Sequence, residues 1–113
     1  MHEFSITQNI LSIALEKARE AKASKITMIT ITIGELSGIV DESVQFYFDF
    51  LRRDTIAAEA ALSFNRTPFQ ARCRTCGRVF SPDGAAWACP ACQSQQIEIT
   101  SGRECYVESI EVD

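Results

Sequence analysis

The chain lacks long apolar runs and clusters of basic residues. No apolar stretch approaches the ~18 residues of a membrane-spanning helix, which predicts a protein without a membrane span. Its 113 residues carry a net charge of −4 and no run of Lys or Arg, which argues against a nucleic-acid partner. The N-terminus has no basic segment followed by an apolar one, so we expect no signal peptide and a cytoplasmic location.

Groups that catalysis commonly uses are also scarce. His2 is the only histidine, and the sequence contains neither a Gly-rich phosphate loop nor a recognisable nucleophile paired with a base. These absences predict that the protein is not an enzyme. Apolar residues make up 46% of the chain, so most of it should be globular, with one modest core.

Four cysteines in two Cys-x-x-Cys pairs dominate what the chain does contain. The pairs are Cys73 with Cys76 and Cys89 with Cys92, and twelve residues separate them. This spacing is typical of a zinc knuckle, in which each pair presents two sulfurs to one tetrahedral ion. The segment between the pairs is poor in large apolar residues, so a metal would supply the stability that a core cannot. Four protein ligands leave no open position, which predicts a structural role for Zn²⁺.

Two other uses of these cysteines stay open at this point. Iron in a Cys₄ site would make a rubredoxin-like electron carrier, since tetrahedral sulfur ligation does not distinguish zinc from iron. A dithiol redox pair would titrate as two thiols and hold no metal. The fifth cysteine, Cys105, lies in an expected strand and is interpreted as a small buried hydrophobe.

Hydrophobic periodicity predicts two helices and four strands. The expected helices cover 5–22, with Ser5 and Gln8 forming a capping box, and 41–53, with Asp41 as N-cap. The expected strands cover 25–33, 60–72 with a break at Pro68, 96–100 and 103–112.

The simplest assembly of these elements is an α+β fold. We expect a small, mostly antiparallel three-stranded sheet with two helices on one face, into which a Cys₄ zinc-knuckle lobe is inserted. Residues 1–72 and 96–113 would form one domain, and residues 73–95 the zinc-binding domain. A turn is expected at residues 81–84 within the lobe.

The first residues have the chemistry of a second metal site. With Met1 retained, as expected before a bulky second residue, the α-amine, the His2 amide and the His2 imidazole can chelate one ion. Square-planar donation of this kind favours Cu(II) or Ni(II) over Zn(II), and Glu3 adds a carboxylate. The alternatives are a frayed terminus for His2 and, for Glu3, an acid that complements a helix dipole.

Taken in combination, these motifs resemble the HypA/HybF family of nickel metallochaperones, which mature nickel–iron hydrogenases. The resemblance runs nearly end to end. It rests on the Met-His-Glu start, the segment Ile-Gly-Glu-Leu-Ser at 33–37, the aromatic helix with Phe46, Tyr47 and Phe48, both cysteine pairs and the Ile-Glu-Val end at 110–112. Each motif is weak alone, and the combination is specific.

The resemblance implies roles for particular residues. Cys73, Cys76, Cys89 and Cys92 would hold structural Zn²⁺, His2 would be the essential nickel ligand, and Glu3 would lie beside it. Some family members add an acid from the loop before the second helix, for which Asp41 is the nearest candidate; Val40 stands where that acid is expected. Whether Asp41 or Glu35 ligates nickel is left open.

The resemblance also implies a cargo and partners. Ni²⁺ would be bound reversibly and passed on, and the implied partners are a nickel-inserting GTPase of the maturation pathway and the hydrogenase large subunit. The protein itself would be a monomer or a homodimer. The alternative function is a zinc-ribbon protein-interaction adaptor without a nickel role, which the same four cysteines support equally.

Overall fold

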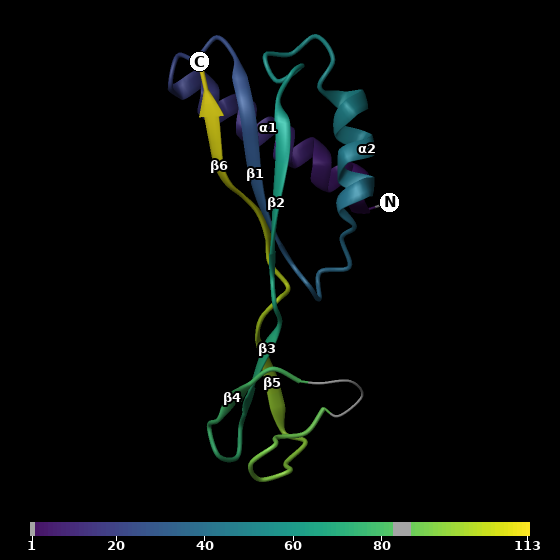
Figure 1. Ribbon diagram of the computed structural model, residues 1–113, viewed down its shortest axis with the longest axis vertical. Coiled ribbons are helices and arrows are strands. Elements are labelled where there is room, and N and C mark those ends of the chain that lie inside the picture. Colours follow the sequence, from purple (N-terminus) through teal and green to yellow (C-terminus); the bar gives the residue numbers. More distant parts are fainter. Residues whose placement is uncertain (1, 83–86) are drawn as a thin grey trace. The chain divides into compact units, whose positions relative to one another are not determined.

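The computed structural model describes residues 2–82 and 87–113, apart from the His2 side chain. In chain order its elements are α1 (His2–Glu20), β1 (Ile26–Gly34), α2 (Asp41–Leu51), β2 (Ala61–Thr67), β3 (Gln70–Cys73), β4 (Val79–Phe80), β5 (Ile97–Ser101) and β6 (Cys105–Val112) (Figure 1). The expected α+β fold with two helices and a cysteine lobe is confirmed. Within the described ranges, no helix combines the length and the apolar character needed to cross a bilayer.

The chain folds into two compact units. The helical unit comprises Met1–Thr32, Gly38–Asn65 and Cys105–Asp113, and the cysteine unit comprises Ile33–Ser37 and Arg66–Glu104. The segment expected to bind zinc falls within the cysteine unit. The assignment of one metal to each domain stays a prediction.

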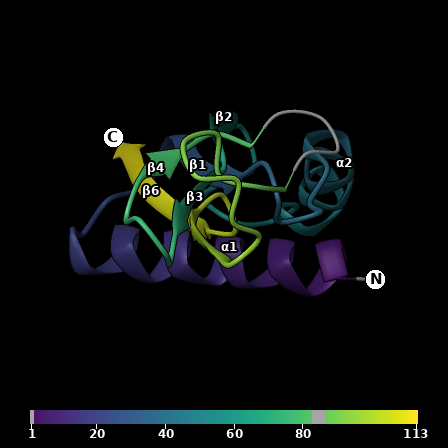
Figure 2. The ribbon, with the colours of Figure 1, turned by 90° about the horizontal axis from the view of Figure 1, so that it is seen from below.

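The helical unit is built on a sheet with the strand order β2-β1-β6. Its α1 contacts both α2 and β6, and it runs along one side of the strands with its first turns beside α2 (Figures 1 and 2). Apolar side chains on these elements form the core because they recur with the period of each element. The buried members are Ile10, Leu11, Ala14 and Ala18 of α1, Ile26, Ile29 and Ile31 of β1, and Val44 and Phe48 of α2.

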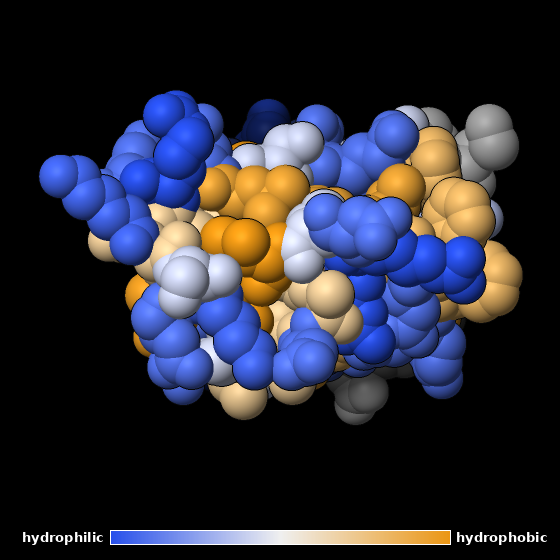
Figure 3. Space-filling view, turned by 90° about the horizontal axis from the view of Figure 1, so that it is seen from above, coloured by the Kyte–Doolittle hydropathy of each residue, from blue (hydrophilic) through white to orange (hydrophobic). Residues whose placement is uncertain are grey.

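Polar side chains surround this core at the end of the helical unit where the C-terminus lies. Figure 3 shows hydrophilic residues ringing an apolar centre there. The loop between α2 and β2 passes this end and includes Ile56, an exposed apolar residue. Apolar residues that are partly accessible to solvent are ordinary on the surface of a folded protein.

The predicted start of α1 is wrong, and α2 begins at Asp41 as predicted but with a different N-cap. The α1 helix begins at His2 rather than Ser5, so the capping box between Ser5 and Gln8 does not form. The extra turn is stabilised by a tertiary contact, since the Phe4 ring lies 5.3 Å from the Tyr47 ring in an edge-on arrangement. In α2 the N-cap is Val40, in an extended conformation and without a side-chain cap, so Asp41 is the first helical residue.

The cysteine unit contains a second sheet with the order β4-β3-β5. Both pairings are antiparallel, with Ala71 opposite Phe80 in β4 and opposite Ile99 in β5. The expected break at Pro68 is confirmed, because β2 and β3 lie on either side of it. The expected turn at 81–84 falls partly outside the described residues.

Two glycines in the cysteine unit let backbone segments approach each other closely. The Gly34 N–H donates to the Glu104 carbonyl at 2.7 Å, and the Leu36 N–H donates to the Gly102 carbonyl at 2.7 Å. A Cβ on Gly34 would lie well inside van der Waals distance of the Gly102 backbone, and a Cβ on Gly102 would collide with Phe69. Any side chain there would therefore push these segments apart.

We predict that Gly34→Ala destabilises the protein by about 1–3 kcal/mol, the usual cost of overpacking. Urea unfolding followed by circular dichroism measures it. Gly38→Asn is the control, since a Cβ at Gly38 meets nothing within 4 Å and asparagine tolerates its positive φ of 77°. Equal unfolding midpoints for the Gly34→Ala variant and the unaltered protein would contradict the close-approach argument.

Candidate metal centre

The first cysteine pair lies in a tight turn that directly follows β3. The Cys73 N–H donates to the Arg78 carbonyl at 2.8 Å, and the Gly77 N–H donates back to the Cys73 carbonyl at 2.8 Å. The N–H groups of Thr75 and Cys76 both point at the Cys73 sulfur, 3.4 Å away. The turn thus satisfies its own backbone while it aims amide donors at a sulfur.

The second pair lies in a turn with the same hydrogen bonds. The Cys89 N–H donates to the Ser94 carbonyl at 2.9 Å, and the Gln93 N–H donates to the Cys89 carbonyl at 2.7 Å. The Ala91 N–H donates to the Cys89 sulfur at 3.4 Å. Gln93 has a positive φ of 63°, and the corresponding residue of the first turn is Gly77, at 82°. A left-handed residue therefore closes each turn, although only one of them is glycine.

The two turns bring all four sulfurs together. The four ligand atoms lie within 4.8 Å of one another, with 3.5 Å between the sulfurs of Cys73 and Cys92 and 3.6 Å between those of Cys76 and Cys89. Tetrahedral zinc, with Zn–S bonds of about 2.3 Å, requires sulfurs about 3.8 Å apart. The residues present therefore fit one tetrahedral ion, with Cys73 and Cys89 buried and Cys76 and Cys92 exposed.

The amide donors make Cys73 an unusually acidic thiol. The backbone N–H of Cys76 is the main cause, helped by that of Thr75 and by the neighbouring sulfurs, and together they lower the Cys73 pKa to about 6. The backbone N–H of Cys92, with that of Ala91, lowers the pKa of Cys89 in the same way. The Cys73 sulfur is thus prepared to be a thiolate near neutral pH, which is the form that binds metal, and the pKa of Cys89 is shifted in the same direction.

Cys92 behaves in the opposite way. The Ser94 N–H acts to lower its pKa, but the adjacent Cys73 sulfur and burial outweigh this effect and raise the Cys92 pKa to about 12. The group of sulfurs therefore titrates as a unit, and it keeps at least one proton when no cation is present. A divalent ion would replace that proton, and its positive charge would offset the repulsion between four thiolates at these distances.

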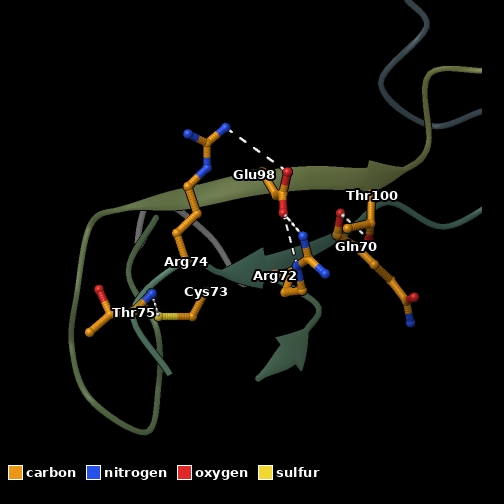
Figure 4. A network of polar contacts seen from close by, with 7 residues as sticks. All are labelled: Gln70, Arg72, Cys73, Arg74, Thr75, Glu98 and Thr100. Atoms are coloured by element: carbon orange, nitrogen blue, oxygen red, sulfur yellow. Dashed lines mark hydrogen bonds and ion pairs between the residues drawn. The ribbon is translucent and has the colours of Figure 1, made fainter. Parts of the chain in front are cut away.

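Charged residues that the sequence analysis did not single out lie beside the first turn. Arg72 and Arg74 flank Cys73 in the chain, and both guanidinium groups point toward Glu98 on β5 (Figure 4). Together with Gly77 they line a recess of about 410 Å³. The alternation of arginine and cysteine at 72–74 was the signal available in the sequence.

The expected N-terminal site is described only in part. The α1 helix begins at His2, while Met1 and the His2 side chain lie outside the described part of the chain. Glu3 is in the first turn, where its charge complements the positive end of the helix dipole. The contact between Phe4 and Tyr47 holds this turn beside α2.

The two additional acids belong to different units. Asp41 is the first residue of α2 in the helical unit. Glu35 is in the cysteine unit, where its carboxylate accepts a hydrogen bond from the Phe69 N–H at 3.3 Å. A ligand role for either acid stays open.

The fifth cysteine is less buried than expected. Cys105 begins β6 at intermediate exposure, and burial raises the pKa of its thiol. It lines an apolar recess of about 200 Å³ with residues of α1, among them Ile6, Ile10 and Ile13. The raised pKa keeps the thiol protonated and unreactive at neutral pH.

Comparison with known proteins places this geometry in context. The family model described as "Hydrogenase/urease nickel incorporation, metallochaperone, hypA" matches residues 1–112. The chain belongs to this family. The hydrogenase maturation factor HypA of Dehalococcoides mccartyi (strain ATCC BAA-2266 / KCTC 15142 / 195) is 48% identical over 113 residues, which span 100% of this chain and 95% of the relative. HypA of Caldanaerobacter subterraneus subsp. tengcongensis is 44% identical over 114 residues, with 100% of both chains covered.

Solved structures of the family have the same fold. The solution structure of the Ni metallochaperone HypA from Helicobacter pylori matches with a TM-score of 0.71 and 26% identity, covering 97% of this chain and 96% of that one. A second HypA solution structure matches with a TM-score of 0.78 and 27% identity, covering 99% and 96%. The resemblance inferred from the sequence motifs is thereby confirmed at the level of the family.

The unequal closing residues of the two turns lead to a prediction about metal affinity. Gly77→Ala places a side chain at a φ of 82°, which costs about 1–2 kcal/mol and should weaken zinc binding several-fold. Gln93→Gly relieves the same strain in the second turn and should not weaken zinc binding. Competition with a chromophoric chelator measures both affinities. A larger loss for Gln93→Gly than for Gly77→Ala would show that the φ values do not govern the turns.

Proposed function

We propose that this protein binds Ni²⁺ at its N-terminus and delivers it during maturation of a nickel–iron hydrogenase. The observation that carries the proposal is the family match across residues 1–112. The curated relatives are named hydrogenase maturation factors, and the Helicobacter pylori neighbour is named a Ni metallochaperone. The proposed partners are a nickel-inserting GTPase and the hydrogenase large subunit.

The local structure of α1 supports the proposed nickel chelate. The ligands would be the Met1 α-amine, the His2 amide nitrogen and the His2 imidazole, with the Glu3 carboxylate nearby. Because α1 begins at His2, the His2 N–H has no partner four residues earlier in the helix. Its deprotonation would therefore break no helical hydrogen bond, and a square-planar nitrogen set favours Ni(II) over Zn(II).

The charge of the helical unit also suits a cationic cargo. It contains eleven acidic and six basic residues, whereas the cysteine unit contains four acidic residues and five arginines. Both helices begin with acids, Glu3 in α1 and Asp41 with Glu42 in α2. This negative charge attracts divalent cations to the unit that holds the proposed site.

The cysteine centre has a separate role in this proposal. One structural Zn²⁺ would be held by Cys73, Cys76, Cys89 and Cys92. Its charge would allow all four sulfurs to be thiolates at these short distances, including Cys92 with its raised pKa. With four protein ligands the ion would have no position left for exchange or catalysis. It would keep the cysteine unit folded while nickel came and went elsewhere.

We predict that His2→Ala abolishes nickel binding and leaves the zinc content unchanged, because the substitution removes the imidazole and leaves only the α-amine and a backbone amide as nitrogen donors. Equilibrium dialysis against Ni²⁺ followed by elemental analysis of both metals measures this. Gln8→Ala, an exposed change in the same helix, is the control. Unchanged nickel stoichiometry in the His2→Ala protein refutes the assignment. A protein that binds zinc and no nickel at all, with or without His2, is the zinc-ribbon adaptor instead.

A second prediction tests the α-amine. A short Gly-Ser extension before Met1 turns that amine into an amide, which is a much poorer donor at neutral pH, so nickel affinity should fall at least tenfold. Isothermal titration with Ni²⁺ measures the change. The same extension added after Asp113 is the control and should have no effect. Equal affinities for the two extended proteins would exclude the amine as a ligand.

A further inference from the structure

Arg72, Arg74 and Glu98 surround the recess of about 410 Å³ in the cysteine unit and are called the arginine face here. The ion pairs within this face leave guanidinium N–H groups that could bind another carboxylate. Arg72 and Glu98 are opposite each other in the register of β3 and β5. Both hydrogen bonds from Arg72, from Nε at 2.8 Å and from Nη2, go to the same carboxylate oxygen, Oε1. Arg74 Nη2 lies 4.0 Å from the other oxygen, Oε2, beyond hydrogen-bonding distance (Figure 4).

Arg74 is therefore held near a carboxylate without a close hydrogen bond to it. Its side chain is 63% exposed, whereas that of Glu98 is 31% exposed. A guanidinium carries five N–H donors in a planar fork that matches the two oxygens of a carboxylate. The adjoining recess, lined also by Cys73 and Gly77, gives an incoming side chain room to reach that fork.

The composition of the unit indicates which ligand the fork would accept. All five basic residues of the cysteine unit are arginines, and its four acids leave a net charge of only +1. A metal-bound set of four thiolates would add −2, so the loaded unit would carry a net charge of −1 and would repel any polyanion, whether nucleic acid or a long acidic tract, at long range. A carboxylate can still bind locally, and Glu98 already accepts hydrogen bonds from the guanidinium of Arg72 on the same face.

We propose that the arginine face binds a single carboxylate side chain of a partner protein. A carboxylate of the partner bridges Arg74 and the free side of Arg72, in competition with Glu98. This interaction surface shares no residue with the proposed nickel site, because all of its residues belong to the cysteine unit and none is a proposed nickel ligand.

The experiment uses the full-length, zinc-loaded protein and a short fluorescein-labelled peptide that carries one glutamate and no other charged side chain, with binding followed by fluorescence anisotropy. Arg74→Ala should weaken binding about tenfold, the usual loss for a charge-assisted hydrogen bond. Glu98→Gln should strengthen binding several-fold, because it removes the internal competitor. Arg19→Ala and Glu16→Gln are matched controls, since Arg19 and Glu16 form an exposed pair in the helical unit, and neither change should alter binding.

Other outcomes overturn the proposal. Equal losses for Arg74→Ala and Arg19→Ala would show that the peptide responds to overall charge. Tighter, Arg74-dependent binding of single-stranded DNA would assign the face to nucleic acid. If Arg74→Ala lowers the zinc content, Arg74→Lys decides instead: it keeps the charge and loses the fork, so it should still weaken binding several-fold with zinc retained. Binding unchanged in Arg74→Lys rules the fork out.

Discussion

Four sulfur atoms within 4.8 Å of one another are the constraint on which the cysteine unit depends. Contact with the Cys73 sulfur, together with burial, raises the Cys92 pKa to about 12, while amide donors lower that of Cys73 to about 6. A cation would offset the charge of the thiolates and hold the two turns together. The described part of the cysteine unit has few buried apolar residues that could stabilise it instead. The helical unit is stabilised differently, by a conventional core of isoleucine, leucine, alanine, valine and phenylalanine.

This difference separates the two proposed metal roles. A site closed by four protein ligands exchanges its ion slowly, whereas a site at the start of a helix has solvent on one side and free backbone donors on the other. The acids are likewise concentrated in the helical unit, with eleven of the fifteen. A structural ion and a transported ion can thus coexist in one small chain without competing for the same donors.

Sequence reasoning predicted what depends on local spacing and missed what depends on distant contacts. The cysteine spacing predicted a single cluster, and periodicity located both helices and the long strands. The start of α1 could not be predicted because it depends on Phe4 contacting Tyr47, 43 positions away in the sequence. The strand β4 has only two residues, too few for a periodic signal, and the role of Gly34 depends on Gly102 lying against it.

The matching hydrogen bonds of the two cysteine turns bear on the kinetics of metal loading. Each turn closes its own ring of backbone bonds, from Cys73 to Arg78 and from Cys89 to Ser94, and a side-chain hydrogen bond of 2.9 Å between Thr75 and Ser94 links the two turns. An ion can therefore be captured first by one preorganised bidentate half, and the second half then closes over it as a unimolecular step. Release has to reverse this order, so the slow process is the parting of two intact halves rather than the loss of single ligands.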